Sequence, residues 1–232
     1  LDAPYNVPTS AFEKEFFAGL DKFAFYNSLN SACEKNNGKT IVQLLSEKQY
    51  KAIVSNLLSK EGLNYGNLPK GLLEFHKYAA STRRPIEEHL VEGALYAPNA
   101  DGGVNIHFTV SPEHKELFQS LLLEKTALYE KQFGVTYNVS YSEQKASTDT
   151  VAADMDNNVF REESGAMLFR PGGHGALIEN LNDIDSDIIF VKNIDNTIPD
   201  RLKEAETCYK KILAGILVEK QSKAFEYLHL LE

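Results

Sequence analysis

The fold can be worked out from one stretch, Val104-Asn105-Ile106-His107-Phe108-Thr109-Val110, in which apolar and polar side chains alternate. This alternation is typical of a β-strand with one buried face. Ser111-Pro112-Glu113 then predicts the start of a long helix that runs to about Phe133, and a second strand is expected from Val135 to Tyr141. Strand and helix alternating at this spacing predict a mostly parallel sheet with right-handed crossovers. The fold class is therefore expected to be α/β.

The same alternation continues towards the C-terminus. A strand at residues 166–169 leads through a glycine-rich loop into a helix at about residues 176–181, and a strand follows at residues 187–192. Ile188-Ile189-Phe190-Val191 is apolar without a polar break, which is typical of a central strand covered by helices on both faces. A last helix is predicted from Pro199 to the C-terminus.

The N-terminal part of the chain has a helical pattern instead. Between residues 10 and 60 apolar residues recur every three and four positions, which predicts two amphipathic helices separated near Asn36-Asn37-Gly38. Pro85 begins a further helix that runs to about Tyr96. The chain is therefore expected to form one domain, with a helical segment at 1–61, an α/β core at 62–200 and a C-terminal helix at 201–232.

Composition excludes several classes of function. The 232 residues carry a formal net charge of −9, which argues against a nucleic-acid-binding surface because phosphate backbones are met by clustered Lys and Arg. No apolar run is long enough to span a bilayer, and no basic-then-apolar signal opens the sequence. Cys33 and Cys208 lie far apart and outside any metal-binding or redox motif, which suits a reducing cytoplasm. We therefore expect a cytoplasmic protein without a membrane or nucleic-acid partner.

The glycine-rich loop is the strongest local signal for a ligand. Gly172, Gly173 and Gly175 lie between an apolar strand and a helical run, so the backbone N–H groups could approach an anion closely. The alternative is a tight turn that requires positive φ angles. His174 stands inside the loop, where its ring could donate a hydrogen bond to a phosphate or base, or could simply be solvated.

A second set of candidate residues follows the predicted central strand. In open α/β sheets ligands bind outside the carboxyl ends of the strands, where Lys192-Asn193-Ile194-Asp195-Asn196 is placed. Asp195 is the carboxylate best suited to Mg²⁺, which takes one or two carboxylates and completes its shell with water and phosphate oxygens. Lys192 could neutralise phosphate or be solvated. The alternative for the Asp and Asn side chains is ordinary capping of the helix at Pro199.

A third set lies before and at the start of the helix at Pro85. Lys70 stands between a proline and a glycine, which restrict the backbone so that its cation could be directed at a ligand. Arg83 and Arg84 precede the helix. For all three cations the alternative is a solvated side chain in a surface turn.

Taken in order, these segments resemble the sugar nucleotidyltransferases, and in particular the UDP-sugar, UDP-glucose and UDP-N-acetylglucosamine pyrophosphorylases. The segments that carry the resemblance are Pro69-Lys70-Gly71-Leu72-Leu73, Arg84 to His89, Tyr141 to Gln144, Pro171-Gly172-Gly173-His174-Gly175, and Ile189 to Asn196 with its Asn-Ile-Asp-Asn end. They span about Leu68 to Asp200. The whole chain also resembles a bacterial domain family of unknown function.

The resemblance implies a three-layer nucleotide-diphospho-sugar transferase fold (Rossmann-like) and a Mg²⁺-dependent transfer between a nucleoside triphosphate, UTP by preference, and a sugar 1-phosphate. Lys70 and Asp195 are the implied catalytic residues, and Asp195 is also the implied metal ligand. The implied nucleotide- and phosphate-binding residues are Gln144, Gly172, Gly173, His174, Gly175 and Lys192. The implied substrate-binding residues are Arg84, Asn193 and Asn196.

One departure from the family pattern leaves an alternative open. The pyrophosphorylases begin with a glycine-rich loop that bears an Arg, and no such loop occurs in these residues; we expect that it either lies upstream, since the chain starts at Leu1 rather than Met, or is lost. A second metal-binding carboxylate is also not identifiable. The alternative function is a protein of the same fold that binds a nucleotide sugar without transferring it.

Overall fold

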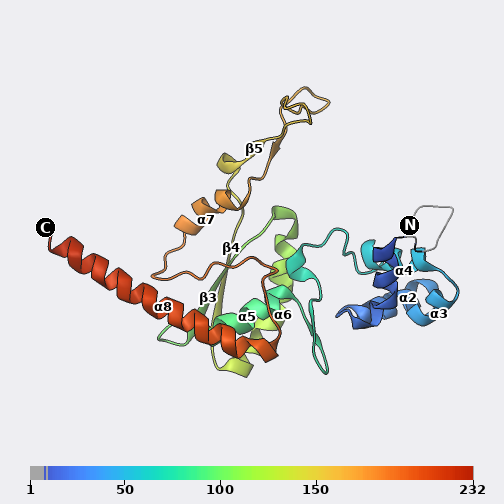
Figure 1. The fold of residues 1–232 in the computed structure, drawn as a ribbon, viewed down its shortest axis with the longest axis horizontal. Helices are drawn as coiled ribbons and strands as arrows, with labels where there is room; N and C mark the ends of the chain where they lie inside the picture. The colour runs from blue at the N-terminus through green and yellow to red at the C-terminus, as the bar shows by residue number, and fades with distance from the viewer. Residues whose placement is uncertain (1–7, 9, 232) are drawn as a thin grey trace. The chain divides into compact units, whose positions relative to one another are not determined.

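A computed structural model describes residue 8 and residues 10–231, which divide into two compact units. Unit 1 contains the described residues up to Glu92 together with Lys192–Cys208 (Figure 1). Unit 2 contains Gly93–Val191 and the described residues from Tyr209 onwards. Helices and strands both occur, so the α/β class expected from the sequence is confirmed at this level.

Unit 1 begins with four helices where the sequence analysis predicted two. They are α1 (Ala11–Ala18), α2 (Tyr26–Asn37), α3 (Ile41–Ser46) and α4 (Tyr50–Leu58), with a 3₁₀ turn, η1, at Leu20–Lys22. The predicted break is at Gly38, whose φ of 67° ends α2 in the left-handed conformation that glycine adopts easily. Ser10 and Thr40 begin α1 and α3 with reciprocal capping boxes, which satisfy backbone N–H groups that have no partner inside the helix.

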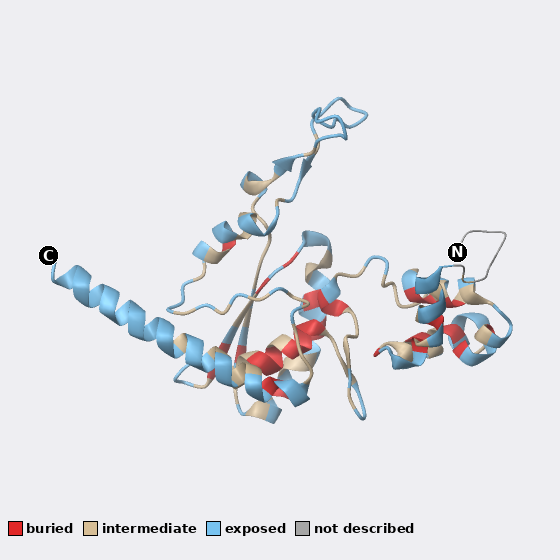
Figure 2. Ribbon diagram, in the orientation of Figure 1, coloured by how far each residue is buried: buried red, intermediate tan, exposed pale blue. Residues whose placement is uncertain are grey.

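These four helices enclose a core of their own. The buried side chains come from α1 to α4 and from η1, and Figure 2 shows them in red inside the helical cluster. Burial of apolar area at roughly 25 cal/mol per Å² is the main favourable term for such a cluster. Its members are Phe17, Leu20, Leu29, Cys33, Ile41, Leu44, Ile53 and Leu57.

The remainder of unit 1 leads into the helix predicted from Pro85. A 3₁₀ turn, η2 (Lys70–Leu72), precedes a hairpin of two short antiparallel strands, β1 (His76–Lys77) and β2 (Thr82–Arg83). Helix α5 then runs over Pro85–Tyr96, as predicted. The carboxylate of Glu87 accepts a 3.1 Å hydrogen bond from the backbone N–H of Arg84 and so caps the start of α5.

Unit 2 is built on the strand that opened the sequence analysis. Strand β3 (Gly103–Thr109) and strand β4 (Thr136–Ser142) pair in parallel over their whole length, and α6 (Lys115–Phe133) connects them after a 3₁₀ turn, η3, at Pro112–His114. The predicted strand–helix–strand unit is therefore confirmed. The rings of Phe108 on β3 and Phe118 on α6 lie 6.1 Å apart and join the sheet to its helix.

The later elements are shorter than predicted. The strand expected at residues 166–169 is reduced to β6 (Phe169–Arg170), which pairs antiparallel with β5 (Thr150–Val151). The glycine loop leads into a 3₁₀ turn, η5 (His174–Leu177), and then α7 (Ile178–Asn182), where a single helix was expected. The other elements are η4 (Ala146–Thr148) and α8 (Asp200–His229).

The predicted central strand at residues 187–192 is wrong: this stretch has no strand partner among the described residues. Its apolar side chains alternate in exposure instead. The ring of Phe190 packs 4.9 Å from that of Tyr96, whereas Val191 is 69% exposed. A strand needs a neighbour for its backbone N–H and C=O groups, and hydropathy alone does not provide one.

The predicted mostly parallel, three-layer arrangement is likewise not confirmed. The described residues form three sheets of two strands each, and only the β3–β4 pairing is parallel. The coarser description, a mixed α/β fold, holds.

Helix α8 is the longest element and carries many apolar side chains on its surface. Figure 2 shows it pale blue along most of its length, and Leu213, Phe225 and Leu228 are each more than half exposed. Within the part of the chain that the structure describes, no helix combines the length and the hydropathy needed to cross a membrane.

Candidate functional site

The residues predicted to be catalytic or to bind the metal lie in unit 1, and those predicted to bind nucleotide and phosphate lie mostly in unit 2. Lys70, Arg84, Lys192 and the Asn193–Asn196 turn belong to unit 1. Gln144 and the glycine loop at residues 172–175 belong to unit 2. We describe the two groups separately.

Lys70 and Asp195 are in direct contact, although 125 residues separate them in the sequence. The Nζ atom of Lys70 lies 2.5 Å from Oδ2 of Asp195. Lys70 starts the η2 turn after Pro69, and Asp195 lies in the turn that follows residue 192. The side chains are 66% and 34% exposed, so the pair is open to solvent and to ligands. An exposed pair of this kind is weak and easily exchanged for other partners.

Behind this pair lies a buried ionic network centred on Glu88, which is fully buried in α5. One carboxylate oxygen accepts a 2.6 Å hydrogen bond from the Tyr78 hydroxyl and lies 3.0 Å from Nδ1 of His76. The other lies 2.9 Å from Nζ of Lys203 and 3.4 Å from the Arg83 guanidinium. Every oxygen of this carboxylate is therefore met by donors, as a buried charge requires.

One turn further along α5, Glu92 extends the network. Its carboxylate lies 2.5 Å from Nζ of Lys192 and 3.4 Å from Nζ of Lys203. Lys192 also lies 2.8 Å from Oε1 of Glu206, and Lys203 donates to the carbonyl oxygen of Ile198. The two lysine side chains are only 6% and 5% exposed. Two carboxylates of α5 thus hold two lysines that flank the Asp195 turn in the sequence.

His89 fixes the turn at its centre. Its Nε2 atom lies 3.0 Å from the carbonyl oxygen of Ile194, the residue before Asp195. A carbonyl only accepts, so Nε2 must carry the proton. Together with Lys192 and Lys203, this bond ties residues 192–203 to α5. The position of the Asp195 carboxylate is therefore set by α5 as much as by its own turn.

The network shifts the pKa values of its members in opposite directions. Burial alone would raise the pKa of the Glu88 carboxyl, but hydrogen bonds from Tyr78, Lys203 and His76 outweigh burial and hold this pKa below its usual value. Burial, followed by the hydrogen bond to Glu88, raises the pKa of the Tyr78 phenol. Burial lowers the pKa of His89, against the opposing effect of its bond to Ile194. Glu88 is therefore held ionised, and Tyr78 and His89 are held neutral, near pH 7.

The other predicted site residues of unit 1 are Arg84, Asn193 and Asn196. Arg84 is partly buried at the start of α5, where its backbone carbonyl accepts hydrogen bonds from Glu87 and Glu88. Asn193 and Asn196 are exposed on either side of Asp195, and the backbone N–H of Asn196 donates to the carbonyl of Asn193. These two amide side chains are placed on the solvent side of the turn.

In unit 2 the structure brings Gln144 and the glycine loop together. A Cβ atom at Gly172 would lie 2.8 Å from the carbonyl oxygen of Thr148 and 3.7 Å from Nε2 of Gln144. No side chain fits at Gly172, so glycine is required here by the close approach of two segments. The Gln144 amide also donates a 3.3 Å hydrogen bond to Asp149.

Helix α7 fixes this arrangement to the carboxyl end of β4. The Asn180 amide, which is buried, donates to the hydroxyl of Ser142 at 2.9 Å and to the carbonyl of Glu143 at 2.8 Å. Ser142 is the last residue of β4, and Gln144 follows two positions later. The glycine loop and the predicted base-reading glutamine therefore both lie at the carboxyl end of a parallel strand, where α/β proteins bind ligands.

The remaining glycines of the loop are not explained by backbone strain. The described glycines with positive φ lie elsewhere, at positions 38, 102, 134 and 165, so the predicted alternative of a positive-φ turn is wrong for this loop. A Cβ atom at Gly173 or Gly175 would meet nothing within 4 Å. His174 is exposed. The backbone at Gly173 and Gly175 is open to solvent, and the packing of the fold does not require glycine at either position.

Comparison with known proteins assigns the chain to a family. The family described as Domain of unknown function (DUF4301) matches residues 2–232. The chain belongs to this family. A search of curated proteins and a search of solved structures each found no match. Membership of the DUF4301 family therefore agrees with the resemblance of the whole chain to a domain family of unknown function.

The DUF4301 chain offers limited protein ligands for a metal. Among the described residues no group of three or more His, Cys, Asp or Glu side chains is placed to hold an ion. Asp195 fits Mg²⁺ as a single, partly exposed carboxylate between two exposed amide side chains, since this ion needs only one or two carboxylates when phosphate and water complete its shell. Such a site would depend on the substrate for most of its ligands.

Three residues of the DUF4301 site were not identified from the sequence: Glu88, Glu92 and Lys203. The signal that could have found the first two is their spacing, because two glutamates four apart on one apolar helix lie on the same face. Glu87 and Glu88 both lie in the first turn of α5, where a negative charge suits the helix dipole. Glu87 has a capping role, whereas Glu88 is turned into the interior.

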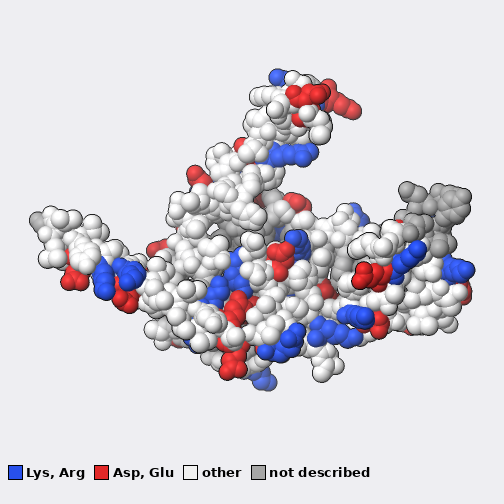
Figure 3. Space-filling model, in the orientation of Figure 1, with Lys and Arg blue, Asp and Glu red and all other residues white. Residues whose placement is uncertain are grey.

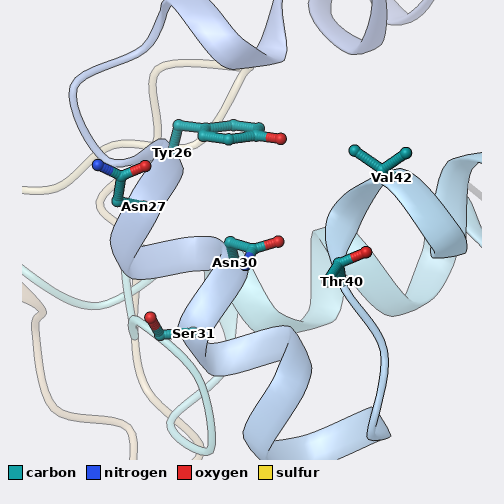
Figure 4. A pocket seen from close by; sticks show the side chains of 6 residues that line it. All are labelled: Tyr26, Asn27, Asn30, Ser31, Thr40 and Val42. Carbon is teal, nitrogen blue, oxygen red and sulfur yellow. The ribbon is translucent and has the colours of Figure 1, made fainter.

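The DUF4301 chain also has a pocket that contains none of the residues predicted to bind a ligand. An open pocket of about 430 Å³ lies between α2 and α3 (Figure 4), and it is lined by Tyr26, Asn27, Asn30, Ser31, Thr40 and Val42. Asn30 in this pocket accepts a hydrogen bond from the backbone N–H of Ile41 and so links the two helices. On the face drawn in Figure 3, basic and acidic side chains lie interspersed.

Proposed function

We propose that this protein is a nucleotidyltransferase that forms a nucleotide sugar from a nucleoside triphosphate, UTP by preference, and a sugar 1-phosphate. In the proposed reaction a phosphate oxygen of the sugar 1-phosphate attacks the α-phosphorus of the triphosphate. The bond from that phosphorus to the bridging oxygen breaks, and pyrophosphate leaves. Such transfers depend on positioning and charge neutralisation rather than on a protein nucleophile.

One observation carries the proposal: the contact between Lys70 and Asp195. These residues are the two that the resemblance to the pyrophosphorylases assigns to phosphate and to metal, and their side chains lie 2.5 Å apart. A cation that binds phosphate and a carboxylate that binds the metal must be neighbours, because metal and phosphate oxygens are themselves in contact.

Each residue of unit 1 then has a defined task. Lys70 holds a phosphate oxygen, and Asp195 with Asn193 and Asn196 faces the sugar phosphate. Mg²⁺, when bound, supplies charge neutralisation at the phosphate oxygens. Glu92, through Lys192, keeps the Asp195 turn in place. We assign Lys192 a positioning task on this ground, because its side chain is buried between two carboxylates.

Unit 2 supports the nucleotide half of the proposal. Gln144 is suited to reading a base edge because its amide offers both a donor and an acceptor. The open backbone at Gly173 and Gly175 is suited to close contact with the nucleotide. The three-layer nucleotidyltransferase fold belongs to the same proposal, and the β3–α6–β4 unit supports it.

The test is pyrophosphate release by the purified protein with UTP, Mg²⁺ and a panel of sugar 1-phosphates. Lys70→Ala and Asp195→Ala are each expected to lower turnover by a factor of about 10² to 10³, because each removes a charge that faces the transferring group. Lys220→Ala is the matched control, since Lys220 is an α8 lysine that is as exposed as Lys70. Turnover that survives both site substitutions would refute these assignments.

The same assay separates the competing function, a protein that binds a nucleotide sugar without transferring it. The absence from these residues of the Arg-bearing glycine-rich loop, which the pyrophosphorylases use to hold the triphosphate, favours this alternative. Its signature is an increase in thermal unfolding temperature with a UDP-sugar, lost in Gln144→Ala, without any pyrophosphate release.

A further inference from the structure

A second cleft in unit 1, away from the residues named above, has the composition of a binding site. It has a volume of about 320 Å³ and lies between the segment around η1 and the residues that precede β1. The side chains that define its chemistry are Phe23, Phe25, Tyr65, Phe75, Glu74 and Lys22. Four of its eight lining residues are therefore aromatic, and one carboxylate and one amine accompany them.

The aromatic wall is organised rather than incidental. The rings of Phe23 and Phe25 stack with their centroids 5.0 Å apart and their planes at 14°. Phe25 meets Tyr65 edge-on, with centroids 5.5 Å apart. Phe23 remains 40% exposed, which is unusual for a large aromatic side chain whose neighbours are packed. Three of the aromatic side chains that line the cleft are thus held in place by ring contacts.

Glu74 gives the cleft an uncompensated negative charge. One of its carboxylate oxygens accepts a 2.7 Å hydrogen bond from the Ser28 hydroxyl, but the other, Oε2, is buried and has no hydrogen-bond partner. Within residues 10–231 no basic side chain forms a salt bridge with it. A buried carboxylate oxygen left unsatisfied is costly, and such an atom calls for a missing partner.

We propose that this cleft binds a small organic ammonium ion. A cation over aromatic faces is attracted by the ring quadrupoles, and quaternary ammonium groups are recognised in this way by aromatic cages. The Glu74 carboxylate supplies the counter-charge. Lys22, which is exposed, lies at the same cleft and opposes the binding of a cation. The inference is independent of the proposed nucleotidyltransferase activity.

The test is a titration of the protein with tetramethylammonium chloride, followed by NMR of the ligand methyl signal and of the protein amides, with sodium chloride at equal ionic strength as the reference. Binding of tetramethylammonium with shifts confined to residues around Phe25 and Tyr65 is expected. Glu74→Gln, which keeps an oxygen for Ser28, is expected to weaken binding at least about fivefold. Phe25→Leu is expected to weaken binding about two- to fivefold, as loss of one cation–π contact does.

Lys22→Gln keeps the test decisive if Glu74→Gln or Phe25→Leu does not fold. Because Lys22 is exposed, its replacement leaves the core intact and is expected to tighten binding about two- to fivefold by removing a like charge. Equal shifts with sodium and tetramethylammonium, or a Lys22→Gln protein that binds tetramethylammonium no more tightly, would overturn the proposal. A methylated-lysine peptide that binds more tightly than tetramethylammonium would identify the ammonium group as part of a polypeptide; tighter binding of choline would identify a free small molecule.

Discussion

Replacement of Lys70 by Met should make the protein bind Mg²⁺ more tightly while abolishing turnover. Lys70 occupies an oxygen of Asp195 at 2.5 Å, so a divalent cation at Asp195 has to displace it. In the proposed reaction the same lysine is needed to hold phosphate. Affinity for the metal and catalytic rate are thus predicted to change in opposite directions in one variant, which a general loss of structure cannot produce.

The expected gain in affinity follows from the exposure of the pair. Side chains that are 66% and 34% exposed form an ion pair worth roughly 0.2–1 kcal/mol after solvent screening. Loss of this competing interaction corresponds to a factor of about 1.4 to 5 in the dissociation constant for Mg²⁺. A much larger gain is not expected, because water replaces the lysine at little cost. The gain should also shrink at high salt, where the pair is already weakened.

The assay is isothermal titration calorimetry with Mg²⁺ in the absence of phosphate compounds, on wild type, Lys70→Met and Asp195→Asn. Asp195→Asn is expected to abolish the binding that Lys70→Met strengthens. Lys220→Met serves as the control for the loss of one surface charge. If Lys70→Met binds Mg²⁺ no more tightly than the control, Lys70 does not compete with the metal, and the reasoning from the ion pair fails even if turnover is lost.

Three further outcomes are expected. Lys203→Met should lower the free energy of unfolding by about 3–5 kcal/mol in urea melts, because it leaves two buried carboxylates short of a cation. The control Lys220→Met, at an exposed lysine of α8, should change this free energy by less than about 0.5 kcal/mol. Gly172→Ala should destabilise by about 1–3 kcal/mol because its Cβ meets packed backbone, and Gly175→Ala, with open space around it, should leave the melt unchanged but weaken UTP binding in a direct titration. Burial lowers the pKa of His89, so this side chain is neutral in the folded protein and protonates more readily in the unfolded chain. The free energy of unfolding should therefore fall as pH drops below about 6.5. His89→Gln should remove part of this pH dependence and leave the part due to His107, whose pKa is also lowered.

The local sequence pattern was sufficient to predict the β3–α6–β4 unit and helix α5. In the stretch from Val104 to Val110 the alternation of side chains, the proline that follows it and the long amphipathic run all indicate the same structure, and the observed elements match them closely. Agreement between periodicity, capping residues and turn residues makes such a prediction reliable.

The stretch from Ile188 to Val191 shows where local pattern is insufficient. Its apolar run satisfies the hydropathy of a buried strand, but a strand also requires a neighbour with unpaired backbone groups, and this is a property of the whole sheet. In the described residues β3 and β4 pair with each other and no strand forms beside them at this stretch. Phe190 is instead held by one aromatic contact with Tyr96.

The candidate site likewise contains residues that the sequence could predict and residues that it could not. The sequence points to Lys70 because a proline and a glycine flank it, and to Asp195 because it follows the strand predicted at residues 187–192, a strand that does not form in the described part of the chain. Lys203 could not be named, since a lysine in the first turns of a charged helix resembles any solvated lysine until its partner is known. That partner, Glu88, lies more than 100 residues earlier in the sequence, and no local pattern connects the two.

The two kinds of ion pair in unit 1 suit two different tasks. The pairs of Glu88 and Glu92 with Lys203 and Lys192 are almost fully buried, so breaking them strands a charge in a medium of low dielectric constant and they remain closed. The pair of Lys70 with Asp195 is exposed, so its charges can exchange partners at little cost. A fixed pair beside an exchangeable one suits the proposed phosphate site: the buried lysines hold the turn, and in the proposed reaction substrate and metal take over the Asp195 carboxylate from Lys70. For this reason the buried position of Lys192 supports the proposed site, although it removes Lys192 from direct contact with phosphate.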